Sequence, residues 1–482
     1  MEKTAVSQTT GTLLRRPAIE LAALVRSGQI SSRELVEAAL AQAEANSDLN
    51  AFTYLDREGA LAAADAIKPG DPRPFAGVPT AIKELNAVAG QQFTMASDLF
   101  GDLHVDYDAY VVRRIKNAGF ISIGRTSAPE FGIVPTTESR RFGPTRNPWN
   151  LNHSTGGSSG GAAAAVAAGI LPIAQGSDGG GSIRIPAACC GLVGLKTSRG
   201  RVSSGPDAGD DFLGVQNCVS RTVADTAAFL DVVAGYEIGD ATWAPPPPKP
   251  FAASAARKPK KLHIALTTVS ALDTPVDPVA AQAAQNAAKL LASLGHEVEE
   301  ITPPNWQSLD LQPQFMLLYA AGIASGVRYG ASVSKRVPSP ELVEPLTWMF
   351  YQMGLGFTSA DYVGAVAQLQ SYSRAFIAFF SRYDVLLTPA LAQRPLPIGY
   401  LNTCGENPAD EFNKAAIFTP FTPVFNVTGQ PAISLPLYQG PDGLPLAVQL
   451  AGPPLGEGLL LSLAAQLERA LPWAGRMPPA RG

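Results

Sequence analysis

The sequence predicts an α/β fold in which a twisted mixed β-sheet is covered on both faces by α-helices. Segments with apolar residues at helical spacing alternate along the chain with short, β-branched apolar runs that are typical of buried strands. The 482 residues are 46% hydrophobic and only 16% charged, so they can bury a large core. This alternation favours a sheet packed between layers of helices.

The first half of the chain contains a regular series of these elements. Ser31 stands three positions before Glu34, a capping-box spacing that predicts a helix over residues 31–46. A run of helix-forming residues at 162–168 follows a cluster of glycine and serine, so this cluster is expected at a helix N-terminus. Further helices are predicted at 108–118 and 222–234, and strands at 120–124, 170–174 and 191–195.

The proline-rich stretch at 244–250 can continue neither a helix nor a strand, and it predicts a surface crossover. Beyond it, strands are expected at 262–266 and 297–301, a helix at 276–294, and a strand pair that closes the sheet at 430–437 and 446–450. We therefore predict a single domain over residues 1–482. Its parts are a catalytic-motif half at 17–240, the crossover at 241–260, and a remainder at 261–482 with substrate-pocket helices in 305–420.

Charge and cysteine content exclude several classes of function. Lys and Arg number 37 against 41 Asp and Glu, which disfavours nucleic acid or an anionic membrane as a partner. The charged residues near the N-terminus leave no apolar stretch for a secretory signal, so a cytoplasmic location is expected. The four cysteines lack a Cys-x-x-Cys spacing, and neither a disulfide framework nor a metal site is predicted. Cys189 and Cys190 are interpreted as core residues.

Two serines set in glycine are the main catalytic signal. Ser158 lies in the Gly-Gly-Ser-Ser-Gly-Gly segment at 156–161, and Ser182 lies in a second glycine-rich segment at 176–184. Glycine lets backbone N–H groups approach a reacting atom closely, as the stabilisation of an oxyanion requires. The first segment also satisfies Gly-x-Ser-x-Gly, which would make Ser159 a nucleophile, but that reading needs a histidine late in the chain. A phosphate-binding loop is disfavoured because no Gly-Lys pair follows the glycines.

A serine hydroxyl needs a base, and this chain has few histidines to supply one. Only four are present, and neither His263, in a strand pattern, nor His296, at a charged turn, is well placed. Lys83 follows apolar residues and could serve if burial lowered its pKa by roughly three units. The alternative is a structural lysine whose amine reaches solvent from a strand end.

Three motifs together resemble the amidase signature family of serine hydrolases. They are Gly77-Val78-Pro79 before Lys83, the serine-glycine segment at 156–161, and residues 178–187 followed by Gly-Leu-Val-Gly-Leu-Lys at 191–196. The resemblance extends from about residue 17 to the C-terminus and implies the amidase signature fold. This chain departs from the family at Ser177 and Gly179, where threonines are usual.

The resemblance also implies roles for individual residues. Ser182 would be the acylated nucleophile, Lys83 the terminal base, and Ser158 the relay between them, with a cis peptide between Gly157 and Ser158. The N–H groups of Gly179, Gly180, Gly181 and Ser182 would form the oxyanion hole. Ser159, Asp178 and Arg184 would hold the loops, and backbone near Gly132 and Ile133 would border the substrate.

The function that follows is hydrolysis of amide C–N bonds without a metal or organic cofactor. Aromatic and thioether residues gather between 306 and 362, which predicts apolar or aryl amides, and carbamates (urethanes), as small-molecule substrates. The alternatives are the glutaminase subunit of a tRNA amidotransferase and a non-catalytic binding protein with the amidase fold. A monomer or a homodimer is expected.

Overall fold

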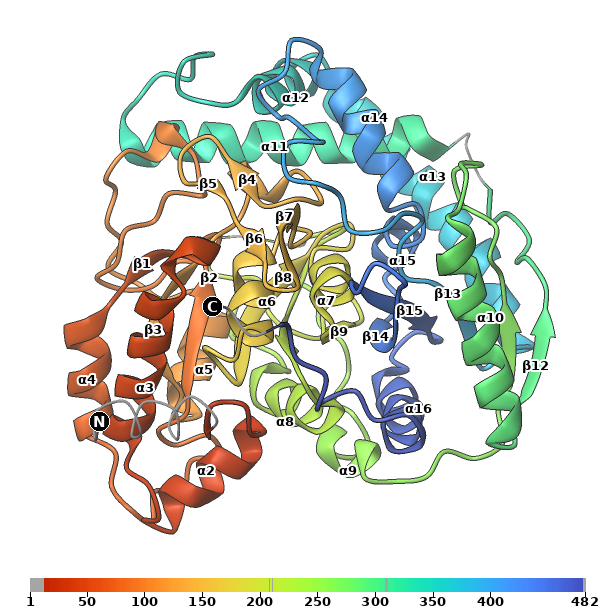
Figure 1. The fold of residues 1–482 in the computed structure, drawn as a ribbon. Coiled ribbons are helices and arrows are strands. Elements are labelled where there is room, and N and C mark those ends of the chain that lie inside the picture. Colours follow the sequence, from red (N-terminus) through yellow and green to blue (C-terminus); the bar gives the residue numbers. More distant parts are fainter. Residues whose placement is uncertain (1–12, 208, 210, 308–310, 480–482) are drawn as a thin grey trace.

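A computed structural model describes residues 13–207, 209, 211–307 and 311–479, and its central feature is an eight-stranded mixed sheet (Figure 1). Two neighbouring pairs are parallel, β11 with β12 and β11 with β13, and the other neighbours are antiparallel. The strands, in order across the sheet, are β12 (Glu297–Glu300), β11 (His263–Leu266), β13 (Val385–Pro389), β15 (Pro445–Ala451), β14 (Ala432–Gln439), β9 (Val193–Lys196), β10 (Val215–Ser220) and β8 (Ile173–Asp178).

The C-terminal strand pair lies in the middle of this sheet, and the prediction that it closes the sheet is wrong. β15 pairs with β13 and β14 pairs with β9, so both strands have neighbours on each side. Every residue of β15 is buried. A strand with this composition is stabilised by a central position, because an edge would leave its backbone groups unpaired.

A second, three-stranded sheet carries Lys83. It has the order β1 (Phe52–Leu55), β3 (Ile121–Thr126) and β2 (Pro79–Lys83). β2 lies against β8 of the large sheet, where Thr80 Oγ1 donates to the Ile173 carbonyl at 3.0 Å and the Lys83 N–H donates to Gln175 Oε1 at 2.9 Å. The ends of β2 and β8 therefore meet.

Helices cover both faces of the large sheet, so the predicted fold class is confirmed. Alternate residues of β11 show the two faces: Ile264 and Leu266 pack in the cluster of α10, whereas Ala265 packs with Phe376 and Phe425. One face is covered by α8 (Val223–Val233), α10 (Pro278–Ser293) and α16 (Glu457–Ala470), and the other by α7 (Arg184–Cys190), α13 (Ser359–Ile377) and α15 (Pro423–Thr428).

The predicted helix signals are present in the structure. Ser31 and Glu34 form the capping box of α3 (Ser32–Ala45), and Thr222 caps α8. α6 (Gly160–Ala167) is wholly buried and begins directly after Ser159, as expected for the alanine-rich run. The N-terminal region also contains α2 (Ala18–Arg26), α4 (Arg57–Asp65) and α5 (Tyr110–Asn117), and the crossover contains α9 (Phe251–Ala255).

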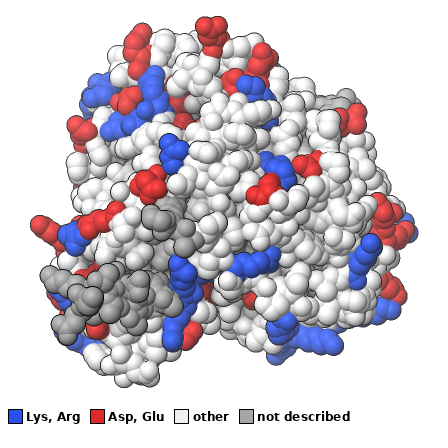
Figure 2. All heavy atoms as spheres, viewed as in Figure 1, with Lys and Arg blue, Asp and Glu red and all other residues white. Residues whose placement is uncertain are grey.

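An aromatic-rich group of helices lies at one end of the molecule, at the top of Figure 1. It consists of α11 (Gln312–Ser334), α12 (Pro345–Leu355) and α14 (Pro408–Phe418), together with α13. No helix in the described ranges is long and apolar enough to cross a membrane. Figure 2 shows acidic and basic side chains interspersed on one face of the molecule, without a large region of one sign.

Candidate active site

The predicted catalytic segments meet where β2 and β8 end and where α6 and α7 begin. Lys83 is the last residue of β2, and Ser158 precedes α6. Ser182 lies in the short loop between β8 and α7. The peptide between Gly157 and Ser158 is cis. The structure therefore brings together residues from two sheets and from two helix N-termini.

The Lys83 amine lies inside the protein and bonds to serine oxygens. Its Nζ is 2.7 Å from Ser158 Oγ, 3.0 Å from Ser177 Oγ and 3.3 Å from the Ser177 carbonyl oxygen. Burial lowers the pKa of Lys83 to about 7, and the charge of Asp178 only partly opposes this shift. A substantial fraction of the amine is therefore neutral near pH 7, as a general base must be.

Ser159 is bonded on both sides and is not placed as a nucleophile. Its Oγ donates to the Ser177 carbonyl at 3.2 Å and accepts from the Ser177 N–H at 3.3 Å, and its own N–H donates to the Ser182 carbonyl at 3.1 Å. The side chain is fully buried. These contacts join the segment before α6 to the nucleophile loop.

Asp178 and Arg184 form a buried ion pair across the loop that carries Ser182 between β8 and α7. Two guanidinium nitrogens of Arg184 each lie 2.9 Å from a different Asp178 carboxylate oxygen, and both side chains are inaccessible to solvent. Burial alone would raise the pKa of Asp178, but the charge and hydrogen bonds of Arg184 outweigh burial and hold it well below its usual range. The carboxylate also accepts from the Gly181 N–H at 2.8 Å and the Ile183 N–H at 3.2 Å. The pair thus fixes the backbone on both sides of Ser182.

The contact with Asp178 changes which N–H groups can form an oxyanion hole. The Gly181 N–H, predicted to be one of the donors, is bonded to Asp178 in this structure. Among the described residues, no hydrogen bond uses the N–H of Gly179, Gly180 or Ser182. A Cβ built on Gly179 or Gly180 would meet no atom within 4 Å, so space for a ligand lies beside both.

Residues far along the chain complete this loop, and the sequence analysis missed them. Thr422 Oγ1 donates to the Gly180 carbonyl at 2.6 Å, and Asn426 Nδ2 donates to Asp178 Oδ1 at 2.9 Å. Gln449 Oε1 accepts from Arg184 at 2.8 Å. Each is an ordinary polar residue in α15, its N-cap or β15, and no local pattern marks it.

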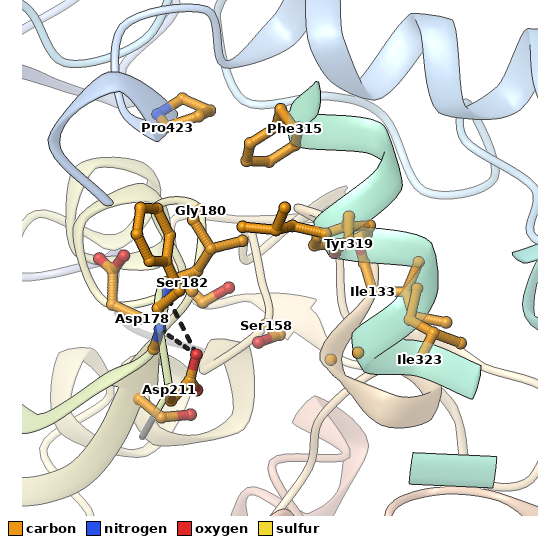
Figure 3. A pocket seen from close by; sticks show the side chains of 18 of the residues that line it. Ile133, Ser158, Asp178, Gly180, Ser182, Asp211, Phe315, Tyr319, Ile323 and Pro423 are labelled. Carbon is orange, nitrogen blue, oxygen red and sulfur yellow. Dashed lines mark hydrogen bonds between the residues drawn. The ribbon is translucent and has the colours of Figure 1, made fainter. Parts of the chain in front are cut away.

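A cavity of about 920 Å³ opens onto both serines. Figure 3 shows Ser158 and Ser182 on one side of it, with Phe315, Tyr319 and Ile323 of α11 facing them. The other apolar residues in its lining include Phe131, Trp306, Met316, Leu318, Phe412 and Val424.

Gly132 and Ile133 also border the cavity. A Cβ on Gly132 would stand 3.2 Å from Ser158 Oγ, and the Ile133 carbonyl accepts a hydrogen bond from the Tyr319 hydroxyl. The loop that carries them therefore lies between the serines and α11.

No group of His, Cys, Asp and Glu suited to a metal ion is found in the part of the chain that the structure describes. His263 lies on β11 and His296 is buried, where its ring bonds to the Leu262 N–H and to Gln466. Neither imidazole lines the cavity. Cys189 and Cys190 are buried in α7, as expected.

Comparison with known proteins gives one family. The family model described as Amidase matches residues 34–461. Proteins named 6-aminohexanoate-cyclic-dimer hydrolase from Pseudomonas sp. (strain NK87) and Paenarthrobacter ureafaciens are 37% and 38% identical over 478 residues, with 95% of each chain covered. A solved 6-aminohexanoate cyclic dimer hydrolase has a TM-score of 0.92 at 36% identity, over 96% of this chain and 99% of that one.

A bacterial aryl acylamidase of the amidase signature family has a TM-score of 0.86 at 27% identity, over 96% of this chain and 99% of that one. These relatives share nearly the whole length of the chain, including the segments that meet at the cavity. The chain belongs to the amidase signature family of amide-cleaving hydrolases.

Proposed function

We propose that this chain hydrolyses apolar or aryl amides, and carbamates, through an acyl-enzyme on Ser182. The observation that carries this proposal is the 2.7 Å contact between Lys83 Nζ and Ser158 Oγ beside an apolar cavity shared with Ser182. In this proposal Lys83 is the base, Ser158 is the relay and Ser182 is the nucleophile.

In the first half of the reaction, neutral Lys83 accepts the proton of Ser158, which in turn accepts the proton of Ser182. Ser182 Oγ then attacks the carbonyl carbon and forms a tetrahedral intermediate. Its oxyanion would be stabilised by the N–H groups of Gly179, Gly180 and Ser182. Loss of one such donor typically costs about a hundredfold or more in rate.

The C–N bond breaks when the relay returns a proton to the leaving nitrogen. Ser158 donates that proton and recovers one from the Lys83 ammonium, so the amine departs and an ester on Ser182 remains. Water then gives a proton to the same relay and attacks the ester carbon. The bond to Ser182 Oγ breaks, Ser182 recovers a proton from the relay, and the carboxylic acid is released. Both halves of the reaction thus use the same three side chains and need no other co-reactant.

The substrate class is inferred from the cavity wall. Aromatic side chains of α11, the Phe412 ring and smaller apolar residues of 415–424 line the space beside Ser182, which favours apolar or aryl groups. A carbamate carbonyl would present the same oxyanion to the same N–H groups. The names of the relatives, a cyclic amide dimer hydrolase and an aryl acylamidase, agree with an apolar amide.

Hydrolysis of an anilide, a urethane, a cyclic amide, a linear aliphatic amide and glutamine by the purified chain tests this proposal. We expect the apolar and aryl substrates to be cleaved fastest. Ser182→Ala should abolish hydrolysis, whereas Ser293→Ala, on the exposed surface of α10, should match the unsubstituted protein. A preference for glutamine would instead support the glutaminase alternative, and unchanged hydrolysis by Ser182→Ala would refute the assigned nucleophile.

A further inference from the structure

We propose that Glu130 is a positioning residue for this reaction, because its buried carboxyl joins the loop that packs on Ser158 to the first turn of α12. The inference rests on the proposed roles of Ser158 and Ser182. It extends them by connecting the proton relay to α12 and, through Tyr319, to the cavity-lining helix α11.

The loop at 130–133 has a backbone that needs support. Phe131 has φ of 50° and Gly132 has φ of 72°, both in the left-handed region. The Phe131 N–H donates at 2.9 Å to the carbonyl of Met95, which is itself left-handed with φ of 51°. Non-glycine residues rarely adopt this conformation, and they persist in it only where their surroundings impose it.

This loop sets the space around the relay. The position of a Gly132 Cβ lies 2.8 Å from Leu85 Cδ1 and 3.2 Å from Ser158 Oγ, so the backbone of Gly132 lies directly over the Ser158 hydroxyl. A displacement of the loop by about 1 Å would change the room in which Ser158 rotates between Lys83 and Ser182. Misplacement on that scale can reduce a rate about a hundredfold.

Glu130 anchors the beginning of the loop. Its side chain is 2% exposed, and Oε2 accepts from the Glu344 N–H at 2.7 Å and from Thr347 Oγ1 at 2.5 Å. Glu344 is the N-cap of α12 and Thr347 lies in its first turn. In a capping box, a glutamate in the first turn of the helix accepts a hydrogen bond from the N-cap N–H. Glu130 does the same for the Glu344 N–H, but it comes from a distant part of the chain.

Tyr319 anchors the other end. Its hydroxyl donates to the Ile133 carbonyl, and its ring packs edge-on against Phe350 of α12 with centroids 5.5 Å apart. The helix α11, which lines the cavity, and the helix α12, which packs against α11, are thus bonded to opposite ends of one four-residue loop. A movement of this wall would be transmitted to Ser158 through that loop.

The charges around Glu130 make this connection sensitive to alkaline pH. Burial, and then the neighbouring Glu344 carboxyl, raise the pKa of Glu130 to about 8. The Glu344 carboxylate accepts a hydrogen bond from the Arg140 N–H, and the Arg140 side chain pairs with Asp98. The Cys404 thiol also lies near the Glu344 and Glu130 carboxyl groups. The pKa of Glu130 in the folded state exceeds its ordinary value, so protonated Glu130 stabilises the folded chain at low pH. This contribution to the free energy of unfolding is lost as pH rises through about 8, where the buried carboxyl ionises.

The test compares Glu130→Gln and Glu130→Ala with the same changes at Glu468. Glu468 is the control because its half-buried carboxyl accepts from the Val223 N–H at the start of α8, its pKa is raised to about 7, and it does not line the cavity. We expect Glu130→Ala to lower kcat about tenfold or more with little change in KM. We expect the activity of the unsubstituted protein to decline above about pH 8, where Glu130 ionises. Glu130→Gln cannot ionise, so it should retain kcat at neutral pH and lack this decline. Neither Glu468 variant should change kcat or its alkaline limb.

Hydrogen exchange provides a readout that does not depend on amide hydrolysis. In Glu130→Ala the amides of 131–134, of Glu344 and of 346–348 should exchange faster, while those of α8 should be unaffected. An unchanged exchange rate, or an equal loss of kcat in Glu468→Ala, would overturn the inference. If the unsubstituted protein neither cleaves amides nor reacts with phenylmethylsulfonyl fluoride at Ser182, the proposed function fails, and the exchange result still decides whether Glu130 joins the loop to α12.

Discussion

At the scale of single residues, the properties of Lys83 depend on where its amine is buried. The chemistry of a lysine side chain is the same at every position, but here the hydrogen-bond partners of the nitrogen, among the residues that the structure describes, are serine and carbonyl oxygens. Burial lowers the pKa of Lys83 to about 7. The negative charge of Asp178 raises this pKa only in part, because the same carboxylate is paired with Arg184.

The pH dependence of hydrolysis should therefore have an acid limb set by Lys83. Below about pH 7 the amine is protonated and cannot accept a proton, so kcat/KM should fall as pH decreases. Lys83→Met should reduce activity at least about a hundredfold at every pH, as expected for loss of a general base. A pH profile of kcat/KM for both proteins measures this. A profile that is flat from pH 5 to 8 would argue against Lys83 as the base.

Gly132 is a second residue whose replacement has a defined outcome. Gly132→Ala adds a methyl group 3.2 Å from Ser158 Oγ, at φ of +72°, and we expect kcat to fall about tenfold. Gly90→Ala is the control, because Gly90 has φ of +79° but a Cβ there meets nothing within 4 Å. Both variants should lose about 1 kcal/mol of stability from the left-handed backbone, measured by urea denaturation. Equal kcat values in the two variants would contradict the assigned position of the loop.

At the scale of elements, the loop between β8 and α7 positions Ser182, the proposed nucleophile. The loop is short. The Asp178 carboxylate, at the end of β8, accepts hydrogen bonds from the Gly181 and Ile183 N–H groups of this loop. Arg184 extends these contacts to α15 and β15 through the Thr422 carbonyl and Gln449. The glycine-rich segment is flexible by composition, and it acquires one conformation from this buried ion pair.

Removal of Arg184 should consequently affect both stability and activity. Arg184→Ala leaves the Asp178 carboxylate buried without its partner, which typically costs about 3–5 kcal/mol. Urea denaturation measures this loss, and hydrolysis should fall with it because Ser182 is no longer held. Arg16→Ala breaks only an exposed pair with Glu20 on α2 and should cost less than about 1 kcal/mol. A loss of similar size in both variants would show that the buried pair has no special role.

At the scale of the whole molecule, the active site lies between a sheet layer and a helical wall. The catalytic segments come from residues 83–182, and the facing helices come from 312–428. Strands from both halves of the chain form one sheet, since β11, β13, β14 and β15 adjoin β8–β10. The division into a catalytic half, a crossover and a pocket region within a single domain stays a prediction, as do a cytoplasmic location and a monomeric or homodimeric state.

Local patterns in the sequence were sufficient for the fold class and for many of its elements. The capping box at Ser31 depends on contacts within a few residues, and the alanine run of α6 and the strand at 121–126 are marked by their local composition. The motifs around Lys83, Ser158 and Ser182 likewise identified the family, because the residue types and their order are local information. The predicted position of the β14–β15 pair at the edge of the sheet was wrong. Strand order depends on which distant strands pair with these two and bury both faces of the sheet.

Tertiary structure alone decided how the two serines and the lysine are arranged. Lys83 ends a strand of the smaller sheet and Ser182 follows a strand of the larger one, so their meeting depends on the packing of β2 against β8. The contacts of Thr422 with Gly180, and of Glu130 with Glu344, join residues more than 200 positions apart. No periodicity or motif records such contacts, because they arise only when burial brings distant segments together. Burial also sets the pKa of Lys83, and so only the folded chain determines that this lysine can act as a base.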